Sequence, residues 1–431
     1  MSLKDKAIAI FKPSRYKTSK VYGFRGGDWT FSRNSASSRF DENGLISDVA
    51  ANVPRLDYNV VGDCPQVRQE GDTTNSCPYS EDINGYWGKQ NVGVTANVAT
   101  APDGSYTASR LYNLAATNVQ FLLYKQTNIT VVSGRNYILS VFVKPEKYFK
   151  VCLHLGGSSV FTYDLRDGES ANVIAYPDGW YRVWASITAS SNSNEYFYIS
   201  FDEVGIRTES PESSKTLLIW GAQIQEYVLS DYIPTTSNAV TAPAEPISNG
   251  AISGLNGTDL YTVYFDNFER TQNVVATTAQ FIGEGNIYSG SLHQYTYNFY
   301  YTNSSGNSYA LSGLDTSEKY NRIAIKHAGN GLFYVFRNGV KVATYDHSSV
   351  FASNQVYDTV SFNPIRYVYN GSFGRNEGGL LEYVLFKGDV TDDECRFLTS
   401  YRDYDEQAAR MNLTYEHRTK VEANIERIKN L

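Results

Sequence analysis

The segment Tyr181–Thr188, with the sequence YRVWASIT, decides the fold class of this chain. Its side chains alternate in character, so that one face of the segment carries Tyr181, Val183, Ala185 and Ile187. Successive side chains of a β-strand point to opposite sides of a sheet. The two-residue period therefore predicts a strand with one buried face.

Short segments of the same kind flank this strand and are separated by turn residues. They are Leu122–Lys125, Arg135–Val143, Phe149–His154, Val160–Tyr163, Glu195–Phe201 and Thr216–Ile224. Several short strands with no helical pattern between them are typical of a β-sandwich. Residues 76–240 are therefore predicted to form one β-sandwich domain.

The rest of the chain leans toward β structure as well. Its 431 residues suit two to three domains, and its 35 tyrosines favour pleated, half-buried surfaces. Residues 241–390 contain a clear hairpin, Leu332–Tyr345, around the turn pair Asn338-Gly339. We predict a mostly β fold with two antiparallel β-sandwich (jelly-roll) domains, an N-terminal β-rich anchor and a long C-terminal α-helix.

Residues 1–75 combine short β signals with an uneven charge. The first 40 residues carry a net charge of +7 and the whole chain −7, so the remainder carries −14. This asymmetry predicts an anchor that docks on an acidic surface, and the alternative is a solvated charged face. Asn43-Gly44 can adopt the positive φ angles of a tight turn, so Phe31–Tyr58 is expected to contain a hairpin.

Residues 391–431 change to a helical pattern. Thr391-Asp-Asp-Glu394 has the form of a capping box, which begins a helix. A heptad seam follows Phe397 and predicts oligomerisation or partner docking through Tyr401, Tyr404, Ala408, Met411, Tyr415, Val421, Ile425 and Ile428. The alternatives are a break near Asn412 and simple packing on the preceding domain.

The sequence contains no motif of a known enzyme class. G-x-S-x-G, the P-loop and H-E-x-x-H are all missing, and the five histidines have no ligand spacing. We expect no enzyme activity, no cofactor and no metal. Neither a signal peptide nor an apolar run of membrane-spanning length is visible, which predicts a soluble protein without an export signal.

Carbohydrate binding suits the aromatic content better, because the C–H faces of sugars stack on aromatic rings. The strand-like segment His293–Asn303 offers both aromatic and amide side chains, although one of its faces can equally be core. Trp87 and Trp180 lie near turns and are either exposed platforms or packed residues. The candidate glycan-binding residues are Tyr295, Tyr297, Asn298, Tyr300, Tyr301, Trp87 and Trp180.

An ordered series of motifs resembles bacteriophage virion-appendage proteins, that is, tail or head fibres. The series includes FSRNSASSR (31–39), DENGLI (41–46), NVPRLDY (52–58), GWYR (179–182), WGAQ (220–223) and YIPT (232–235). The resemblance implies a carbohydrate-binding-module-like jelly roll over residues 76–240. Asn321–Ala324, the Asn338-Gly339 hairpin and Leu381–Phe386 resemble concanavalin-like or laminin-G-like lectin sandwiches.

The resemblance implies a structural component of a virion appendage that binds host surface glycans for attachment. Its basic N-terminus would bind other virion proteins, its C-terminal helix would form a homo-oligomer, expected to be a trimer, and it would reside in the virion after assembly in the host cytoplasm. We expect no nucleic-acid binding and no membrane insertion. The alternatives are a purely structural decoration, ring or connector protein and a polysaccharide depolymerase.

Overall fold

The computed structural model describes residues 3–11, 29–58, 66–70, 72–114, 122–125, 129–156, 159–168, 172–201, 215–227, 229–245, 247–249, 255–256, 258–268, 279–283, 286–290, 296–302, 308–315, 320–351, 356–362, 366–369, 372–375 and 378–400. Within these ranges the chain is mostly β, in several antiparallel sheets. The helical elements are α1 (Leu3–Lys6), α2 (Ile83–Tyr86), α3 (Asp392–Thr399) and the 3-10 turns η2 (Leu165–Asp167) and η3 (Pro177–Gly179). None of these helices is long and apolar enough to span a membrane.

The first β unit contains two sheets that share one hydrophobic core. The six-stranded sheet has the order β16 (Val173–Tyr176), β17 (Trp180–Thr188), β13 (Asn136–Pro145), β20 (Thr216–Glu226), β10 (Ala108–Asn113) and β9 (Val92–Ala99). The five-stranded sheet has the order β15 (Ser159–Asp164), β14 (Lys150–Leu155), β19 (Phe197–Ser200), β11 (Leu122–Lys125) and β8 (Trp87–Gln90), and β12 (Ile129–Val131) pairs with β18 (Ser193–Glu195). A single cluster of buried side chains includes Leu139, Val183 and Ile219 from the first sheet and Leu123, Leu153 and Ile199 from the second.

The predicted strand is present as β17, but the expectation of a single buried face is wrong for most of its length. Val183, Ala185 and Ile187 point into the shared core. The other face of the strand is also largely covered, since Arg182 is 1 % exposed and Trp184 is 4 % exposed. The Nη1 atom of Arg182 donates to the carbonyl of Ser230 at 2.8 Å, so the chain after β20 lies over this face.

The outer face of the six-stranded sheet is covered by the N-terminal hairpin of β3 (Ser37–Phe40) and β4 (Ile46–Val49). Phe40 and Ile46 pack into a second apolar cluster with Phe142, Trp180 and Trp220. The predicted hairpin is thus confirmed, but its turn differs from the expectation. Gly44 has a positive φ of 76° and Asn43 does not, because the amide of Gly44 closes a longer loop onto the carbonyl of Asp41 at 3.0 Å.

The second β unit contains an eight-stranded sheet to which both ends of the chain contribute. Its main path is β31 (Val340–Asp346), β30 (Leu332–Arg337), β29 (Tyr320–His327), β24 (Tyr261–Phe268), β35 (Gly378–Lys387), β6 (Gln66–Gln69) and β5 (Arg55–Asp57), and β1 (Ala7–Phe11) also pairs with β35. Three of the eight strands therefore come from the first 75 residues.

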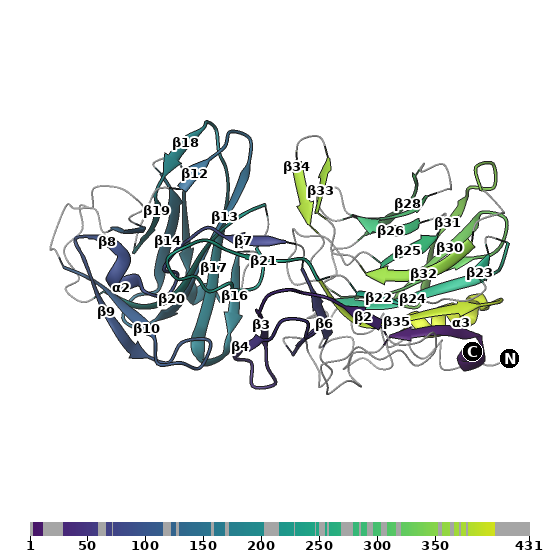
Figure 1. Ribbon diagram of the computed structural model, residues 1–431, viewed down its shortest axis with the longest axis horizontal. Helices are drawn as coiled ribbons and strands as arrows, with labels where there is room; N and C mark the ends of the chain where they lie inside the picture. Colours follow the sequence, from purple (N-terminus) through teal and green to yellow (C-terminus); the bar gives the residue numbers. More distant parts are fainter. Residues whose placement is uncertain are drawn as a thin grey trace.

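Smaller sheets complete the second unit and the junction. A five-stranded sheet joins β2 (Trp29–Phe31), β22 (Ile247–Asn249), β32 (Val356–Phe362), β23 (Leu255–Asn256) and β25 (Ala279–Gly283), and a three-stranded sheet joins β26 (Asn286–Gly290), β27 (Thr296–Thr302) and β28 (Ser308–Asp315). The remaining pairs are β33 (Arg366–Tyr369) with β34 (Ser372–Arg375) and β7 (Thr73–Asn75) with β21 (Val240–Ala242). Figure 1 shows β3, β4, β6 and β7 between the two β units.

Two C-terminal predictions have different outcomes. The Asn338-Gly339 hairpin is confirmed, with positive φ angles of 46° and 82° at its two turn residues. The capping box of α3 is present, but α3 ends at Thr399 and Ser400 has an extended conformation, with φ −77° and ψ 150°. The described part of the predicted helix thus ends at Thr399, and residues 401–431, over which the long helix is predicted to continue, lie outside the described ranges.

Candidate functional site

Six charged side chains lie buried where the N-terminal segment meets the chain that leaves β20. We call them the ion cluster: Arg33, Arg55, Arg68, Glu70, Asp231 and Glu245. Each is between 1 % and 4 % exposed. Charged side chains are almost never buried to this extent unless they are paired, which makes the ion cluster a candidate functional site.

Arg55, on β5, is the centre of the ion cluster. Its guanidinium donates to both carboxylate oxygens of Glu245, and its Nη1 atom donates to Asp231 at 2.8 Å and to the carbonyl of Ser38 at 3.0 Å. A third carboxylate, that of Glu70, lies 3.2 Å from its Nη2 atom. One arginine thus joins the β3–β4 hairpin to residues more than 170 positions later.

The other two arginines, Arg33 and Arg68, bind the same carboxylates as Arg55. Arg33 donates to Glu245 at 2.5 Å and to the carbonyls of Val49 and Ala50 at 3.1 and 2.7 Å. Arg68 donates to Glu70 at 3.0 Å and to Asp231 at 3.2 Å. Backbone amides add to the charge pairing, because the amide of Asp231 donates to Glu70 at 2.8 Å.

The charges of the ion cluster balance, with three guanidinium groups and three carboxylates. Burial alone lowers the pKa of Arg55, but the carboxylates of Glu245, Glu70 and Asp231 raise it well above the ordinary value. Arg33 has one carboxylate partner, and burial lowers its pKa. With its charges matched internally, the cluster has the character of a structural joint rather than of a site for a charged ligand.

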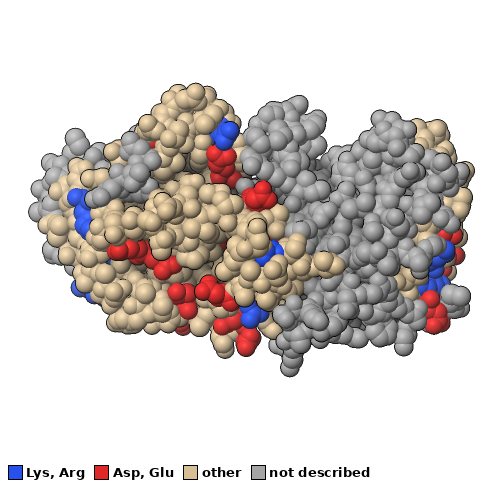
Figure 2. All heavy atoms as spheres, in the orientation of Figure 1, with Lys and Arg blue, Asp and Glu red and all other residues tan. Residues whose placement is uncertain are grey.

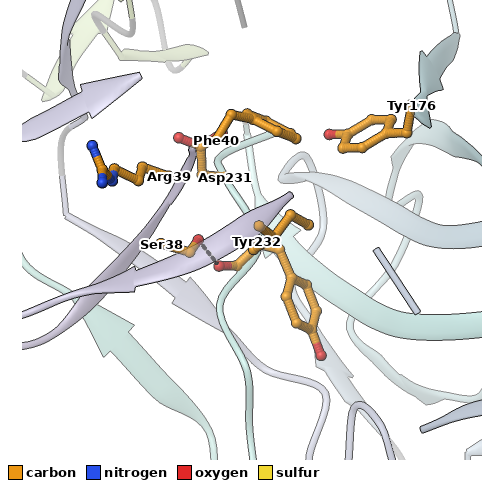
Figure 3. A pocket seen from close by; sticks show the side chains of 7 residues that line it. Ser38, Arg39, Phe40, Tyr176, Asp231 and Tyr232 are labelled. Atoms are coloured by element: carbon orange, nitrogen blue, oxygen red, sulfur yellow. Dashed lines mark hydrogen bonds between the residues drawn. The ribbon is translucent and has the colours of Figure 1, made fainter. Parts of the chain in front are cut away.

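A shallow pocket lies beside the ion cluster, lined by Ser38, Arg39, Phe40, Ile46, Tyr176, Asp231 and Tyr232. Figure 3 shows Tyr176 with its hydroxyl end toward the ring of Phe40, and the two rings are tilted, with centroids 5.1 Å apart. The Oγ atom of Ser38 donates to the carbonyl of Tyr232 at 2.6 Å and closes the floor. The space between these atoms is about 180 Å³ including open solvent. Small-molecule sites usually have about 300–1,000 Å³, so this pocket is too small for one.

Tyr232 fixes the chain after β20 against the first β unit. Its ring packs at 4.6 Å from Trp220, and its hydroxyl lies 2.7 Å from the Oγ atom of Ser80 and 3.1 Å from a carboxylate oxygen of Glu81. Burial raises the pKa of the Tyr232 phenol well above the ordinary value, so the phenol stays neutral. The pocket and the ion cluster are therefore two parts of one rigid joint.

Asn75, at the end of β7, adds side-chain hydrogen bonds to the joint. Its amide donates to the carbonyl of Ile233 at 2.8 Å, and its side-chain oxygen accepts from the amides of Cys77 and Ile224 at 3.0 and 3.1 Å. Asn75 is fully buried. The N-terminal segment is thus bonded to β20 of the first unit, and through β6 and β35 to the second.

The structure places both candidate tryptophans in the interior. Trp87 and Trp180 are each 2 % exposed, and their Nε1 atoms donate at 3.2 Å to the carbonyls of Tyr79 and Thr100. A ring enclosed on both faces cannot stack on a sugar. The exposed-platform interpretation is therefore corrected in favour of packing.

The other predicted residues are only partly within the described chain. Tyr297, Asn298, Tyr300 and Tyr301 belong to β27, which pairs with β26 and β28. Tyr295 and the oligomerisation residues Tyr401, Tyr404, Ala408, Met411, Tyr415, Val421, Ile425 and Ile428 lie outside the described residues. Their predicted roles stay predictions.

Two of the basic N-terminal residues within the described ranges, which were expected to dock on an acidic partner, have acidic partners in the chain itself. Arg33 pairs with Glu245, and Lys6 pairs with Glu394 of α3 at 2.8 Å. Figure 2 shows acidic side chains gathered on the visible face around the middle of the molecule. Across the described ranges, no group of three or more His, Cys, Asp or Glu side chains could hold a metal ion.

The ion cluster was not predicted from the sequence, although the sequence contains a signal of it. Arg55 and Arg68 stand inside short β segments, where a strand buried on both faces would carry apolar residues. Two of the acidic partners, Asp231 and Glu245, lie in or beside a segment rich in proline, threonine and alanine, which has no strand or helix pattern. No local pattern relates residues that are 161 to 212 positions apart.

Comparisons with known proteins give little beyond the geometry. No protein-family model matches the chain, and no curated protein matches its sequence. Among solved structures, a leech intramolecular trans-sialidase is 16 % identical over 34 % of this chain and 24 % of its own, with a TM-score of 0.23. A Trypanosoma rangeli sialidase with the inhibitor DANA is 10 % identical over 68 % of this chain and 60 % of its own, also with a TM-score of 0.23. The chain thus spans about a quarter of the first of these structures and about three fifths of the second. Similarities this weak carry no argument about the fold or the activity of this chain.

Proposed function

We propose that this chain is a structural component of a bacteriophage virion appendage, of the fibre type, and that it binds glycans of the host surface. The proposal combines the motif series of the sequence with the joint between the two β units. The observation that carries it is the ion cluster, whose buried ion pairs connect the N-terminal segment to the chain after β20. A protein that holds two β units in a fixed arrangement is suited to a part of a virus particle that bears mechanical load.

The joint supports this function through its rigidity. Buried ion pairs joined by several hydrogen bonds require one geometry, and removal of any member leaves a buried charge without compensation. The segment that contains FSRNSASSR and NVPRLDY supplies Arg33 and Arg55, and YIPT begins directly after Asp231. Three of the motifs that carry the resemblance therefore meet at the joint.

The finer architecture is part of the same proposal. The first β unit is a jelly-roll sandwich, the second is a lectin-like sandwich, and residues from 401 onward form a helix that assembles the chain into a trimer. Light scattering of the full chain and of a variant truncated after Ser400 tests the assembly. A smaller oligomer is expected after truncation, and an unchanged one contradicts the role of the C-terminal residues.

The virion assignment is tested on purified phage particles. We expect an antibody or a gold label against this chain to decorate an external appendage in electron micrographs. Particles that lack the chain altogether would rule out the assignment. Reducing-sugar release from host capsule by the purified protein would instead favour a depolymerase.

A purely structural virion part is the second candidate, and one observation favours it. The pocket beside the ion cluster is too small for a sugar, and the two tryptophans are enclosed. A decoration, ring or connector protein needs neither. A glycan array with the purified chain separates the two, because the structural candidate predicts no binding to any host-derived glycan.

A further inference from the structure

A row of aromatic side chains crosses the outer face of the five-stranded sheet in the first β unit. Tyr124 on β11 stands opposite Tyr198 on β19, and Tyr198 stands opposite His154 on β14. Cross-strand partners point to the same side of a sheet. Their neighbours Leu123 and Ile199 point into the core, so the row points away from it.

The rings of this row touch one another, and a fourth ring joins them. The centroids of Tyr124 and Tyr198 are 5.9 Å apart, and Tyr196 lies 5.8 Å from Tyr124 and 5.9 Å from Tyr198. His154 stacks nearly parallel on Tyr198 at 4.6 Å. All three tyrosines are partly exposed. We call these four residues the tyrosine face.

Glycine makes room for this arrangement at the edge of the sheet. Gly88 on β8 stands opposite Tyr124, and a Cβ atom at Gly88 would lie 2.3 Å from the Tyr124 ring. The phenol of Tyr124 therefore lies across the backbone of β8 instead of standing up from the sheet. A ring held against the sheet in this way offers a flat surface to a ligand.

Polar groups flank the tyrosine face. The carboxylate of Glu195 lies over Gly156, and the Oγ atom of Ser193 donates to it at 2.7 Å. The Nδ1 atom of His154 lies 3.3 Å from the carbonyl of Gly156. A carbonyl only accepts, so Nδ1 carries the proton, and burial lowers the pKa of His154, which keeps the ring neutral.

The neutral tautomer leaves a lone pair on Nε2 of His154. That atom is buried and accepts no hydrogen bond from the described residues, and the side chain is 3 % exposed. A buried acceptor of this kind is stabilised by an O–H donor. The tyrosine face thus offers three partly exposed rings and one acceptor without a donor, Nε2 of His154, and the carboxylate of Glu195 flanks it.

We propose that the tyrosine face is a binding site for a neutral oligosaccharide. The C–H face of a pyranose ring carries partial positive charge and stacks on the negative face of a phenol ring. Its hydroxyls donate to the carboxylate of Glu195 beside the rings. The carboxylate of Glu195 repels acidic sugars, so uronate and sialate residues bind more weakly than neutral hexoses.

This inference rests on the proposed function, because it names the ligand class and the place of glycan binding. It is independent of the virion assignment, which the labelled particles test separately. It also differs from the β27 candidates, since it uses another β unit. A chain that binds glycans through β27 would keep the proposed function and overturn the tyrosine face.

The chain itself offers a matched control. Tyr112 on β10 lies over Gly93 of β9, and a Cβ atom at Gly93 would lie 2.2 Å from its ring. Tyr112 is partly exposed, as Tyr124 is, but it belongs to the other sheet. Tyr112→Ala and Tyr124→Ala therefore remove the same ring from the same kind of support.

The experiment measures binding of the full chain to neutral glucose-, galactose- and mannose-based tetrasaccharides and to a uronate-containing counterpart. For the neutral sugar that binds best, Tyr124→Ala is expected to weaken affinity about tenfold and Tyr112→Ala by less than about twofold. Glu195→Gln is expected to reduce the preference for neutral over acidic sugar. Equal effects of the two tyrosine variants, or no binding of any neutral tetrasaccharide by the unaltered chain, would overturn the inference. Circular dichroism of each variant confirms that it is folded.

Discussion

At the scale of single residues, burial decides what a charge or an imidazole can do in this chain. Arg55 is 1 % exposed and is surrounded by three carboxylates, so its side chain holds segments of the chain together. His327 is fully buried between Tyr261 and Phe333, with its Nδ1 atom 3.0 Å from the carbonyl of Asp259. Both residues therefore give predictions about stability rather than about catalysis.

Replacement of Arg55 is expected to be strongly destabilising. Arg55→Ala leaves the carboxylates of Glu245, Asp231 and Glu70 short of positive charge, and loss of one partner from a buried ion pair costs about 3–5 kcal/mol. Urea unfolding at neutral pH measures the change. The control is Arg166→Ala, which breaks an exposed pair with Asp164 and is expected to change stability little. Similar unfolding midpoints for the two variants would contradict a supporting role for the ion cluster.

His327 is expected to make the folded state less stable in acid. Burial lowers its pKa to about 4, below the ordinary value of 6.5, so the unfolded chain binds the proton more readily. Stability from this residue is complete above pH 6.5 and falls as the pH drops toward 4, by about 3 kcal/mol in total. Nuclear magnetic resonance titration of the His327 ring checks the pKa. A midpoint near 6.5 in the folded protein would show that burial does not set it.

At the scale of secondary structure elements, termini and turns follow their local sequence closely. The hydroxyl of Thr391 accepts from the amide of Glu394 at 3.1 Å, and the Glu394 carboxylate accepts from the amide of Thr391 at 2.8 Å. This capping box begins α3, which packs against β29, β30 and β31. The same Glu394 pairs with Lys6, the last residue of α1, so the cap also holds the segment that leads into β1.

The Thr391 cap gives a prediction with a conservative control. Thr391→Ala removes the hydroxyl that accepts from Glu394 and is expected to cost about 1 kcal/mol of stability. Thr391→Ser keeps the hydroxyl and is expected to stay close to the unaltered protein. Thermal unfolding of both variants measures the difference. If serine proves as costly as alanine, packing of the threonine methyl rather than capping accounts for the loss.

At the scale of the whole molecule, the first 75 residues are part of both β units. They supply β1, β5 and β6 to the eight-stranded sheet, and the β3–β4 hairpin covers the outer face of the six-stranded sheet. The polar appearance of FSRNSASSRF hides this role, because Ser38 and Arg33 are buried by hydrogen bonds and ion pairs rather than by apolar packing.

Deletion of residues 1–75 is therefore expected to damage both units. The deletion uncovers Phe142 and Trp220, which pack under Phe40 and Ile46. We expect increased binding of the dye ANS, a red shift of tryptophan emission and a less cooperative unfolding transition than in the full chain. A truncated protein with unchanged emission and sharp unfolding would return the N-terminal segment to the status of a separate anchor.

What the sequence alone determined is local in origin. The alternation in Tyr181–Thr188, the Asn338-Gly339 turn and the Thr391–Glu394 cap each depend on residues within about eight positions, and each is present in the structure. Tertiary structure alone decided that Trp180 is enclosed, that α3 ends where Arg322 donates to the carbonyl of Ser400, and that Arg55 pairs with Glu245. These outcomes depend on contacts between residues far apart in the chain. The periodicity of side chains does not encode such contacts, because periodicity reports only which face of an element is apolar.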